Sequence, residues 1–255
     1  MTLTLTSLPG IPLIRPGDDL AEILLSALDN AGIRLVDNDI LVLAQKIVSK
    51  SEGRLVNLTT VTPSQAAIDV AVQAEKDPRF VEMVLRESNR VVRTRPGTLI
   101  VEHKLGFVCA NAGIDHSNVQ GMWGEADDWI LLLPENPDAS ATRIRKKLEA
   151  ASGARLGVMV IDSHGRAWRL GTLGTAIGLS GMPGLVDLRG VSDLFGYQLR
   201  ITQVAASDEL AAAASLIMGQ AAELTPAIHV RGFPYPLREG SLQELIRPKE
   251  LDLFR

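Results

Sequence analysis

The sequence contains a single cysteine, Cys109, so the chain can build neither a disulfide framework nor a zinc site made of several thiolates. It also has no uninterrupted apolar run of about 18 residues, and its first residues show neither a basic stretch nor a long apolar core. Charge of one sign is not in large excess, because 30 acidic residues oppose 26 basic ones for a net charge of -4. These absences predict a cytoplasmic protein that is not exported, does not span a membrane and has no charged surface suited to nucleic acid.

What the sequence does contain is an alternation of helix and strand patterns in a chain of 255 residues, 46% of them hydrophobic. Apolar residues at helical spacing predict helices over residues 18–32, 62–77, 78–92, 136–153 and 207–218. Short apolar runs predict an interior strand from residue 39 and strands near 99–101, 106–110, 129–133, 158–162 and 227–232. The order predicts one mixed α/β domain over residues 1–255, of one or two lobes, with a tail helix in residues 236–255.

Two of the predicted strands end in acidic residues. The stretch "VMVIDSHGRAWR" begins apolar and turns polar at Asp162, and "FVCANAGIDHSN" repeats the pattern with Asp115. Magnesium is usually held by one or two carboxylates together with substrate phosphates and water, so the two acids predict a metal site if the strand ends converge. The alternative is that each acid is a turn residue, since Asp favours turns through hydrogen bonds to the nearby backbone.

The neighbouring polar residues match no common catalytic or nucleotide-binding signature. Ser163 and His164 are adjacent on a strand and should point to opposite faces, and no G-x-S-x-G elbow surrounds them. The four histidines lack the spacing of a metal centre, and the chain has neither a G-x-x-x-x-G-K-[ST] loop nor a clear G-x-G-x-x-G. These observations argue against a serine hydrolase, a histidine-built metal site and the P-loop and Rossmann nucleotide sites.

Two further stretches allow either a structural or a functional interpretation. Residues Gly171–Gly181, "GTLGTAIGLSG", suit a strand pair with close backbone approaches or a loop that lines a phosphate pocket. Lys46 and Lys50 lie near the end of the predicted interior strand, where they could meet phosphate oxygens or form an ordinary solvated pair. The residues alone leave both questions open.

Taken together, these stretches resemble the coenzyme F-420:L-glutamate ligase family, the γ-glutamyl ligases that extend the tail of the deazaflavin coenzyme. The resemblance covers nearly the whole chain and rests on segments in the family's order: "LPGIPLIRPGDDL", "IVSKSEGR", "NAGIDHSNV", "VIDSHGRAWRLGTLGTAIGLSG", "DLFG" with "SDELAAAASLIMGQ", and "AIHVRG". It implies a homodimeric ligase that depends on GTP and a divalent metal, with an α/β fold unlike the P-loop and Rossmann types.

The resemblance also implies roles for individual residues. Asp115 and Asp162 match the family's metal-binding aspartates, and Ser163 stands where relatives often have a threonine ligand of a second metal. The family's nucleotide-binding segments match Gly10, Ile11, Pro12, Gln45, Lys46, Lys50 and Asn118, together with Met218, Gly219, Gln220, Ala221 and Ala222. Gln220 departs from relatives that carry an acidic metal ligand there. Its amide oxygen can still ligate a hard cation, but with one negative charge fewer. The glycine-rich run that can follow in relatives is also missing.

The implied reaction starts when GTP phosphorylates a carboxylate of the coenzyme precursor F-420-0, and the amine of L-glutamate then displaces the phosphate. Asp115, Asp162 and Lys50 would serve catalysis by positioning and charge neutralisation, with two magnesium or manganese ions. A need for potassium, the physiological metal and the number of glutamates added stay open. So do three alternatives: a folate γ-glutamyl ligase of the same family, a metal-dependent phosphohydrolase, and a catalytically silent nucleotide-binding homologue.

Overall fold

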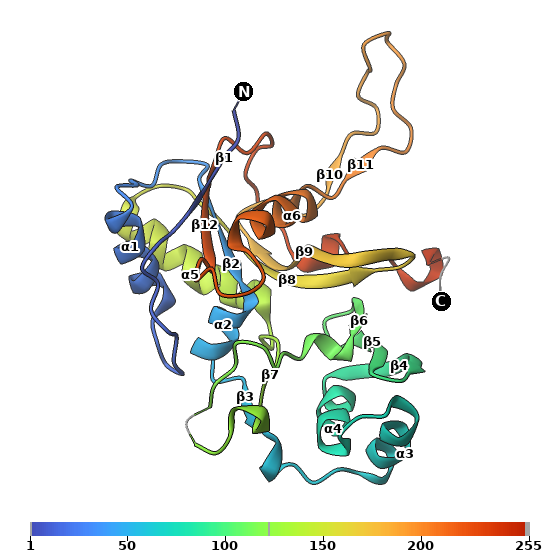
Figure 1. The fold of residues 1–255 in the computed structure, drawn as a ribbon. Helices are drawn as coiled ribbons and strands as arrows, with labels where there is room; N and C mark the ends of the chain where they lie inside the picture. The colour runs from blue at the N-terminus through green and yellow to red at the C-terminus, as the bar shows by residue number, and fades with distance from the viewer. Residues whose placement is uncertain (1, 122, 253–255) are drawn as a thin grey trace.

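The computed structural model describes residues 2–121 and 123–252, and its largest element is a five-stranded mixed sheet (Figure 1). The strands follow the order β1 (Thr4–Ser7), β12 (Ala227–Arg231), β2 (Ile40–Ala44), β8 (Gly157–Arg166) and β9 (Arg169–Ser180). Neighbouring strands are antiparallel except for β2 and β8, which run parallel. The carboxyl ends of β2 and β8 therefore lie toward the same edge of the sheet.

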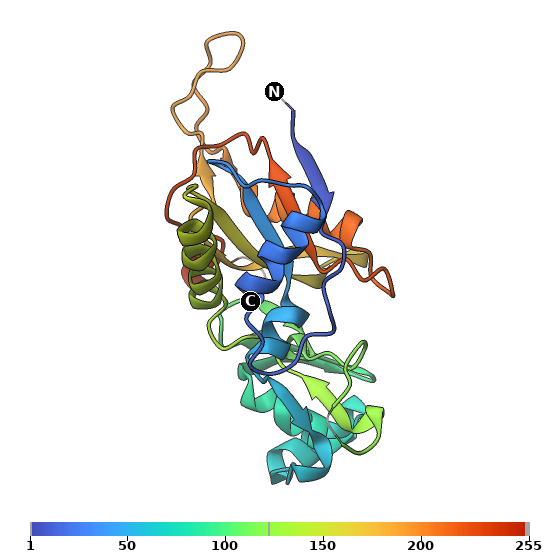
Figure 2. The same cartoon turned by 90° about the vertical axis from the view of Figure 1, so that its left-hand side faces the viewer.

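Helices cover both faces of this sheet (Figures 1 and 2). The helices α1 (Leu20–Asn30) and α5 (Pro137–Ser152) pack against one face, where Leu41 of β2 is buried. The helix α6 (Ala206–Met218) packs against the other face, where the preceding residue Ile40 is buried. Because successive strand residues point to opposite faces, the continuous apolar run of β2 is buried on both sides.

A smaller sheet with a hydrophobic core of its own lies at the other end of the molecule (Figure 1). Its antiparallel strands follow the order β4 (Ser88–Arg95), β5 (Thr98–His103) and β6 (Val108–Ala110). The helices α3 (Gln65–Ala74) and α4 (Pro78–Arg86) contribute to this core. Among the described residues, the small sheet thus has a core separate from the two that flank the large sheet.

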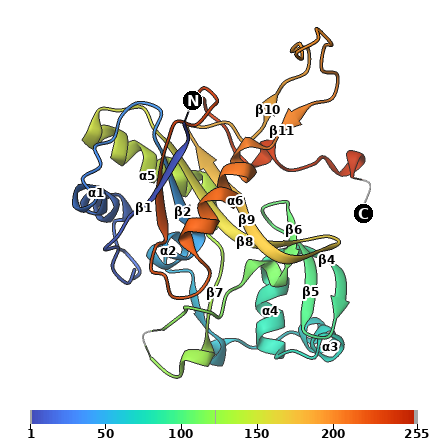
Figure 3. The ribbon, with the colours of Figure 1, turned by 45° about the horizontal axis from the view of Figure 1, so that its top comes forward.

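Shorter elements complete the fold. The helix α2 (Gln45–Ser51) follows β2 directly, and β3 (Leu55–Asn57) pairs with β7 (Trp129–Leu131). The strands β10 and β11 form the base of an arm that projects from the molecule (Figure 3) and bears exposed apolar residues at its tip. The strand β10 spans Val186–Asp187, and β11 spans Gln203–Val204. The 3-10 turns span Leu58–Thr60, Asn111–Gly113, Ala126–Asp128, Leu242–Glu244 and Lys249–Leu251. Within the described ranges, no helix is long and apolar enough to cross a membrane.

The structure confirms the predicted mixture of helices and strands, but local predictions in two segments, residues 78–92 and 236–255, are wrong about helices. The predicted helix over residues 78–92 ends at Arg86, and residues from Ser88 onward form the edge strand β4. In β4, Val91 packs toward the small core while Arg90 pairs with the buried Glu102 of β5, so the neighbouring strand decides the conformation. Residues 236–252 form two 3-10 turns and no α-helix, and residues 253–255 of the predicted tail helix lie outside the described part.

The glycine-rich stretch from residue 171 to 180 is part of β9, which confirms the strand interpretation, and Gly181 follows the strand. A Cβ atom added at Gly174 would lie 2.3 Å from the carbonyl oxygen of Ala211 on α6, and one at Gly178 would lie 2.5 Å from the carbonyl carbon of Pro137 on α5. The two glycines therefore allow α6 and α5 to approach β9 from opposite faces.

Candidate active site

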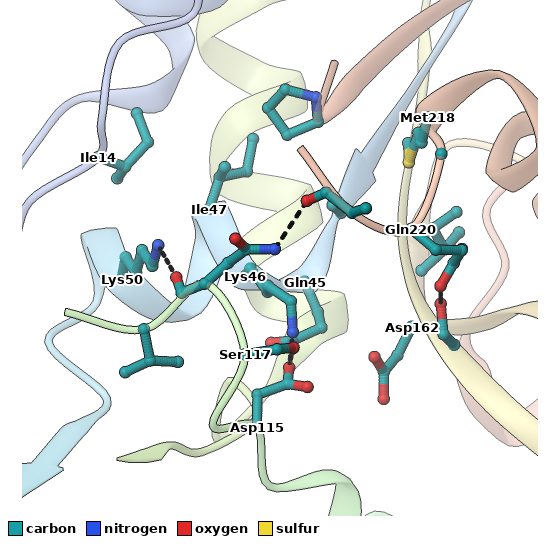
Figure 4. Close-up of a pocket in the computed structure, with 18 of the residues that line it drawn as sticks. Ile14, Gln45, Lys46, Ile47, Lys50, Asp115, Ser117, Asp162, Met218 and Gln220 are labelled. Carbon is teal, nitrogen blue, oxygen red and sulfur yellow. Dashed lines mark hydrogen bonds and ion pairs between the residues drawn. The ribbon is translucent and has the colours of Figure 1, made fainter. Parts of the chain in front are cut away.

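A cavity of about 1280 Å³ opens where β2 and β8 approach the same edge of the large sheet (Figure 4). Its walls come from segments that are distant in the sequence: the N-terminal loop, α2, the loop after β6, the middle of β8 and the loop after α6. Ligands of α/β proteins commonly bind beyond the carboxyl ends of strands, because chain segments diverge there and leave a crevice. The position of the cavity therefore makes it the leading candidate for an active site.

The helix α2 carries two lysines into the cavity wall. The strand β2 ends at Ala44 and the helix begins at Gln45, so the lysines lie just beyond the end of the interior strand, on a helix that the sequence did not predict. Lys46 and Lys50 are four residues apart on this helix, which places them on the same side. The short helix that follows the buried strand thus places two positive charges in the wall of the cavity.

Asp115 is held by several groups at once. Lys46 forms an ion pair with its Oδ2 atom, and Gln45 Nε2 donates a hydrogen bond to the same oxygen. The amide of Gln45 is itself oriented by Ser49, whose hydroxyl donates to its Oε1 atom at 2.8 Å. The backbone of Asp115 exchanges two hydrogen bonds with Leu131, so the position of the acid is fixed by main chain and side chain together.

Burial and neighbouring charges perturb the titratable groups of this cavity. Burial raises the pKa of Asp115 above its ordinary value; the charge of Lys46 opposes the rise and the charge of Asp162 adds to it. Burial lowers the pKa of Lys50, and the ammonium of Lys46 lowers it further. Figure 4 shows the carboxylates of Asp115 and Asp162 bordering the same space. Such a concentration of partly desolvated charge is typical of a functional site.

Asp162 lies within a strand and not at its end, which corrects the prediction. Pairing with β9 carries β8 past this acid as far as Arg166. The alternation of the strand sends Asp162 and His164 to one face and Ser163 to the other, as the sequence predicts. His164 Nε2 lies 3.1 Å from Oδ2 of Asp162, whereas the hydroxyl of Ser163 donates to Gln220 Oε1 at 2.8 Å. Ser163 and His164 therefore do not form a nucleophile and base.

A chain of hydrogen bonds connects three walls of the cavity. Lys50 Nζ donates to the carbonyl oxygen of Asn118 at 2.7 Å, and the side chain of Asn118 donates to the carbonyl oxygen of Ala221 at 2.9 Å. The first wall is α2, the second is the loop after β6, and the third is the loop after α6. Figure 4 marks the contact of Lys50 with a dashed line. The three segments are thus linked to one another at the cavity.

The structure brings nearly all of the predicted site residues to this one cavity. Gly10 does not line it, although the next two residues do. The predicted residues that line it are Ile11, Pro12, Gln45, Lys46, Lys50, Asp115, Asn118, Asp162, Ser163, Met218, Gly219, Gln220, Ala221 and Ala222. Two supporting residues, Ser49 and His164, were not predicted in the roles that the structure gives them. Their spacing was the available signal, since Ser49 is one helical turn from Gln45 and His164 is two strand residues from Asp162.

The donors in the cavity suit a hard cation. Across residues 2–121 and 123–252, no three or more His, Cys, Asp or Glu side chains are grouped as a complete metal site. The available donors are oxygens, from the carboxylates Asp115 and Asp162 and from Ser163 and Gln220. Two carboxylates with room for water or phosphate oxygens fit magnesium or manganese better than zinc. Burial raises the pKa of the nearby Cys109 to about 12, which keeps it a thiol and not a thiolate ligand.

The family model for F420-0:Gamma-glutamyl ligase matches residues 10–232. The chain is 45% identical to the coenzyme F420:L-glutamate ligase of Methanothermobacter thermautotrophicus over 257 aligned residues, covering 100% of both chains. It is 44% identical to the protein of the same name from Methanococcus maripaludis strain C6, covering 96% of this chain and 94% of the relative. A third relative of that name, from Methanopyrus kandleri, is 43% identical and covers 100% of this chain and 98% of its own.

Proposed function

Because this chain belongs to the F420-0:Gamma-glutamyl ligase family, we propose that it is a GTP-dependent ligase that joins L-glutamate to the coenzyme F-420 precursor F-420-0. Further γ-linked glutamates would be added by the same chemistry. One observation carries the proposal: two acids and two lysines line one cavity of a chain that is similar to named ligases over its whole length. Those residues are Asp115, Asp162, Lys46 and Lys50.

Formation of the amide requires an activated carboxylate. A carboxylate oxygen of the acceptor attacks the γ-phosphorus of GTP, the bond to the β–γ bridging oxygen breaks, and GDP and an acyl phosphate result. The amine of glutamate then attacks the acyl carbon, inorganic phosphate leaves, and the nitrogen loses a proton. These two reaction steps need no covalent bond to the enzyme. This agrees with the state of the cavity's cysteine, Cys109, which is buried as a thiol.

The two lysines would bind the phosphates of GTP. The ammonium of Lys46 is held by Asp115 and that of Lys50 by the carbonyl of Asn118, so both are already positioned at the cavity wall. Burial disfavours the charge of Lys50, and a phosphate oxygen would restore a favourable partner for it. Phosphoryl transfer depends mainly on such positioning and charge stabilisation, so Asp115, Asp162 and Lys50 are the proposed catalytic residues.

The oxygen donors of the cavity would hold divalent ions. Asp115 and Asp162 would bind one magnesium or manganese ion, and Ser163 with Gln220 would contribute to a second. When bound, such ions neutralise charge on phosphate oxygens. The two pairs of donors lie on opposite faces of β8, and the neutral amide of Gln220 gives its side less negative charge than a carboxylate would.

We further propose that the protein is a cytoplasmic homodimer with a single ligase domain. The projecting arm supports the dimer, because Leu194 and Phe195 at its tip are 97% and 94% exposed, and Ile201 near its base is 88% exposed. Apolar side chains gathered in this way usually meet a protein surface. Light scattering coupled to size exclusion chromatography tests this directly, and a mass of one chain would contradict it.

The activity is tested by incubating the protein with GTP, L-glutamate, magnesium or manganese, and either F-420-0 or a folate acceptor. Products are weighed by mass spectrometry, and GDP and phosphate are measured with each component omitted in turn, with and without potassium. We expect release of GDP to depend on glutamate and an increase in the mass of F-420-0. A folate product would instead identify a folate ligase, release of phosphate without glutamate a phosphohydrolase, and no release of either a silent nucleotide-binding protein.

A further inference from the structure

His164 is a largely buried residue of the cavity that the proposed reaction leaves without a role. It lies on β8 two residues after Asp162, so the two side chains point to the same face of the strand. Its Nε2 atom lies 3.1 Å from Oδ2 of Asp162, and the side chains are only 11% and 12% exposed. An ionised carboxylate only accepts hydrogen bonds, so this contact requires the proton of the imidazole on Nε2.

The imidazole is itself held by Phe107. The two rings are tilted by 53°, with their centroids 5.1 Å apart. Phe107 also stacks on His103 at the end of β5, with the centroids 5.2 Å apart and the planes 9° from parallel. Because Phe107 packs against the cores of both sheets, it forms a fixed wall beside the imidazole. His164 therefore has little freedom to turn away from Asp162.

We propose that His164 is a positioning residue that orients the carboxylate of Asp162 for a divalent cation. The proposal rests on the metal-binding role of Asp162 in the proposed function. The hydrogen bond uses Oδ2 and leaves the other carboxylate oxygen available as a ligand. Asp115 has a matching support, because Gln45 donates to its carboxylate. Donors of this kind fix the direction of a ligating carboxylate, and losing one typically lowers metal affinity about 10–100-fold.

Two substitutions separate this role from simple packing. His164→Phe keeps an aromatic ring beside Phe107 but has no N–H group, whereas His164→Gln has no ring but keeps a donor. Binding of manganese alone to the full chain is followed by the loss of the electron paramagnetic resonance signal of the free ion. We expect His164→Phe to need about tenfold more manganese for half saturation and His164→Gln to stay within about threefold of the wild type. In the ligase assay, His164→Phe should lower kcat and leave KM for glutamate unchanged.

Asp162→Asn is measured in parallel, so that failure of the inference can be told from failure of the proposed function. If Asp162→Asn loses manganese and His164→Phe binds it like the wild type, the inference is overturned and the role of Asp162 stands. An equal loss in both His164 variants would also overturn it, because the ring and not the donor would then matter. If the wild type and Asp162→Asn bind alike, or neither binds, both proposals fail. Should His164→Phe not fold, a tenfold loss in His164→Gln would overturn the inference by itself.

Discussion

Replacing Gly174 by alanine should destabilise the protein by pushing α6 away from β9. The added Cβ atom would lie 2.3 Å from the carbonyl oxygen of Ala211 and 2.7 Å from the Cβ atom of Ser215, both on α6. Ordinary carbon–oxygen contacts are about 3.3–3.6 Å, so helix and strand must separate by about 1 Å. Overpacking of this kind costs about 1–3 kcal/mol, which corresponds to a fall of roughly 2–12 °C in the unfolding midpoint of a chain of this size.

The displacement should also reach the cavity, because the loop after α6 carries Gln220. Its amide accepts a hydrogen bond from Ser163 on β8, and β8 pairs with the strand that Gly174 occupies. Movement of α6 away from this hairpin would lengthen that contact. We therefore expect Gly174→Ala to raise the metal concentration needed for half-maximal activity as well as to lower the midpoint.

Thermal unfolding followed by circular dichroism measures the effect, and Gly165→Ala in the same hairpin is the matched control. A Cβ atom at Gly165 would meet no atom within 4 Å, so this variant should melt like the wild type. If Gly174→Ala also melts like the wild type, β9 and α6 can accommodate the added Cβ atom with no loss of stability. The argument from close approach would then be refuted.

Three further changes test the cavity itself. Asp115→Asn should abolish ligation yet raise the melting temperature at pH 7. Because the pKa of Asp115 is raised in the folded protein, its negative charge destabilises the fold at pH values above that pKa. The gain in melting temperature from Asp115→Asn should therefore vanish as the pH falls through the pKa of Asp115. An unchanged or lower melting temperature at pH 7 would contradict this. Lys50→Ala should weaken GTP binding about 10–100-fold by calorimetry through loss of a charge-assisted hydrogen bond, whereas the exposed control Lys146→Ala should not. Gln220→Glu should lower the manganese concentration for half-maximal activity about thirtyfold, the effect of one negative charge about 4 Å from a divalent ion in water, and overlapping titrations would exclude Gln220 as a ligand.

The helices were largely predictable because their signals are local. Asn136 caps the start of α5 and Gly153 adopts a left-handed conformation at its end, and both residues are visible in the sequence as boundary signals. Strand limits were less predictable, because they depend on partners far along the chain. Pairing of Ser163 with Gly174 and of His164 with Leu173 continues β8 through residues that locally resemble a turn. The same dependence explains why residues after Arg86 form a strand in place of a predicted helix.

The candidate site was predictable in its members but not in its contacts. The resemblance to a family identified the segments that meet at the cavity, and strand alternation correctly separated Ser163 from His164. The ion pair of Lys46 with Asp115 could not be foreseen, because it joins residues far apart in the sequence and depends on α2, a helix that the sequence did not predict. The donor pair of Ser163 and Gln220 likewise depends on how α6 packs against β9.

The two acids of the cavity depend on different hydrophobic cores, and this links the site to the cooperativity of folding. Asp162 extends from the core of the large sheet, whereas Asp115 follows β6 of the small sheet. Local opening of either core would separate the carboxylates even while the other core stayed intact. The lifetime of the assembled site is therefore set by the less stable of the two cores, and amide hydrogen exchange would show which core that is.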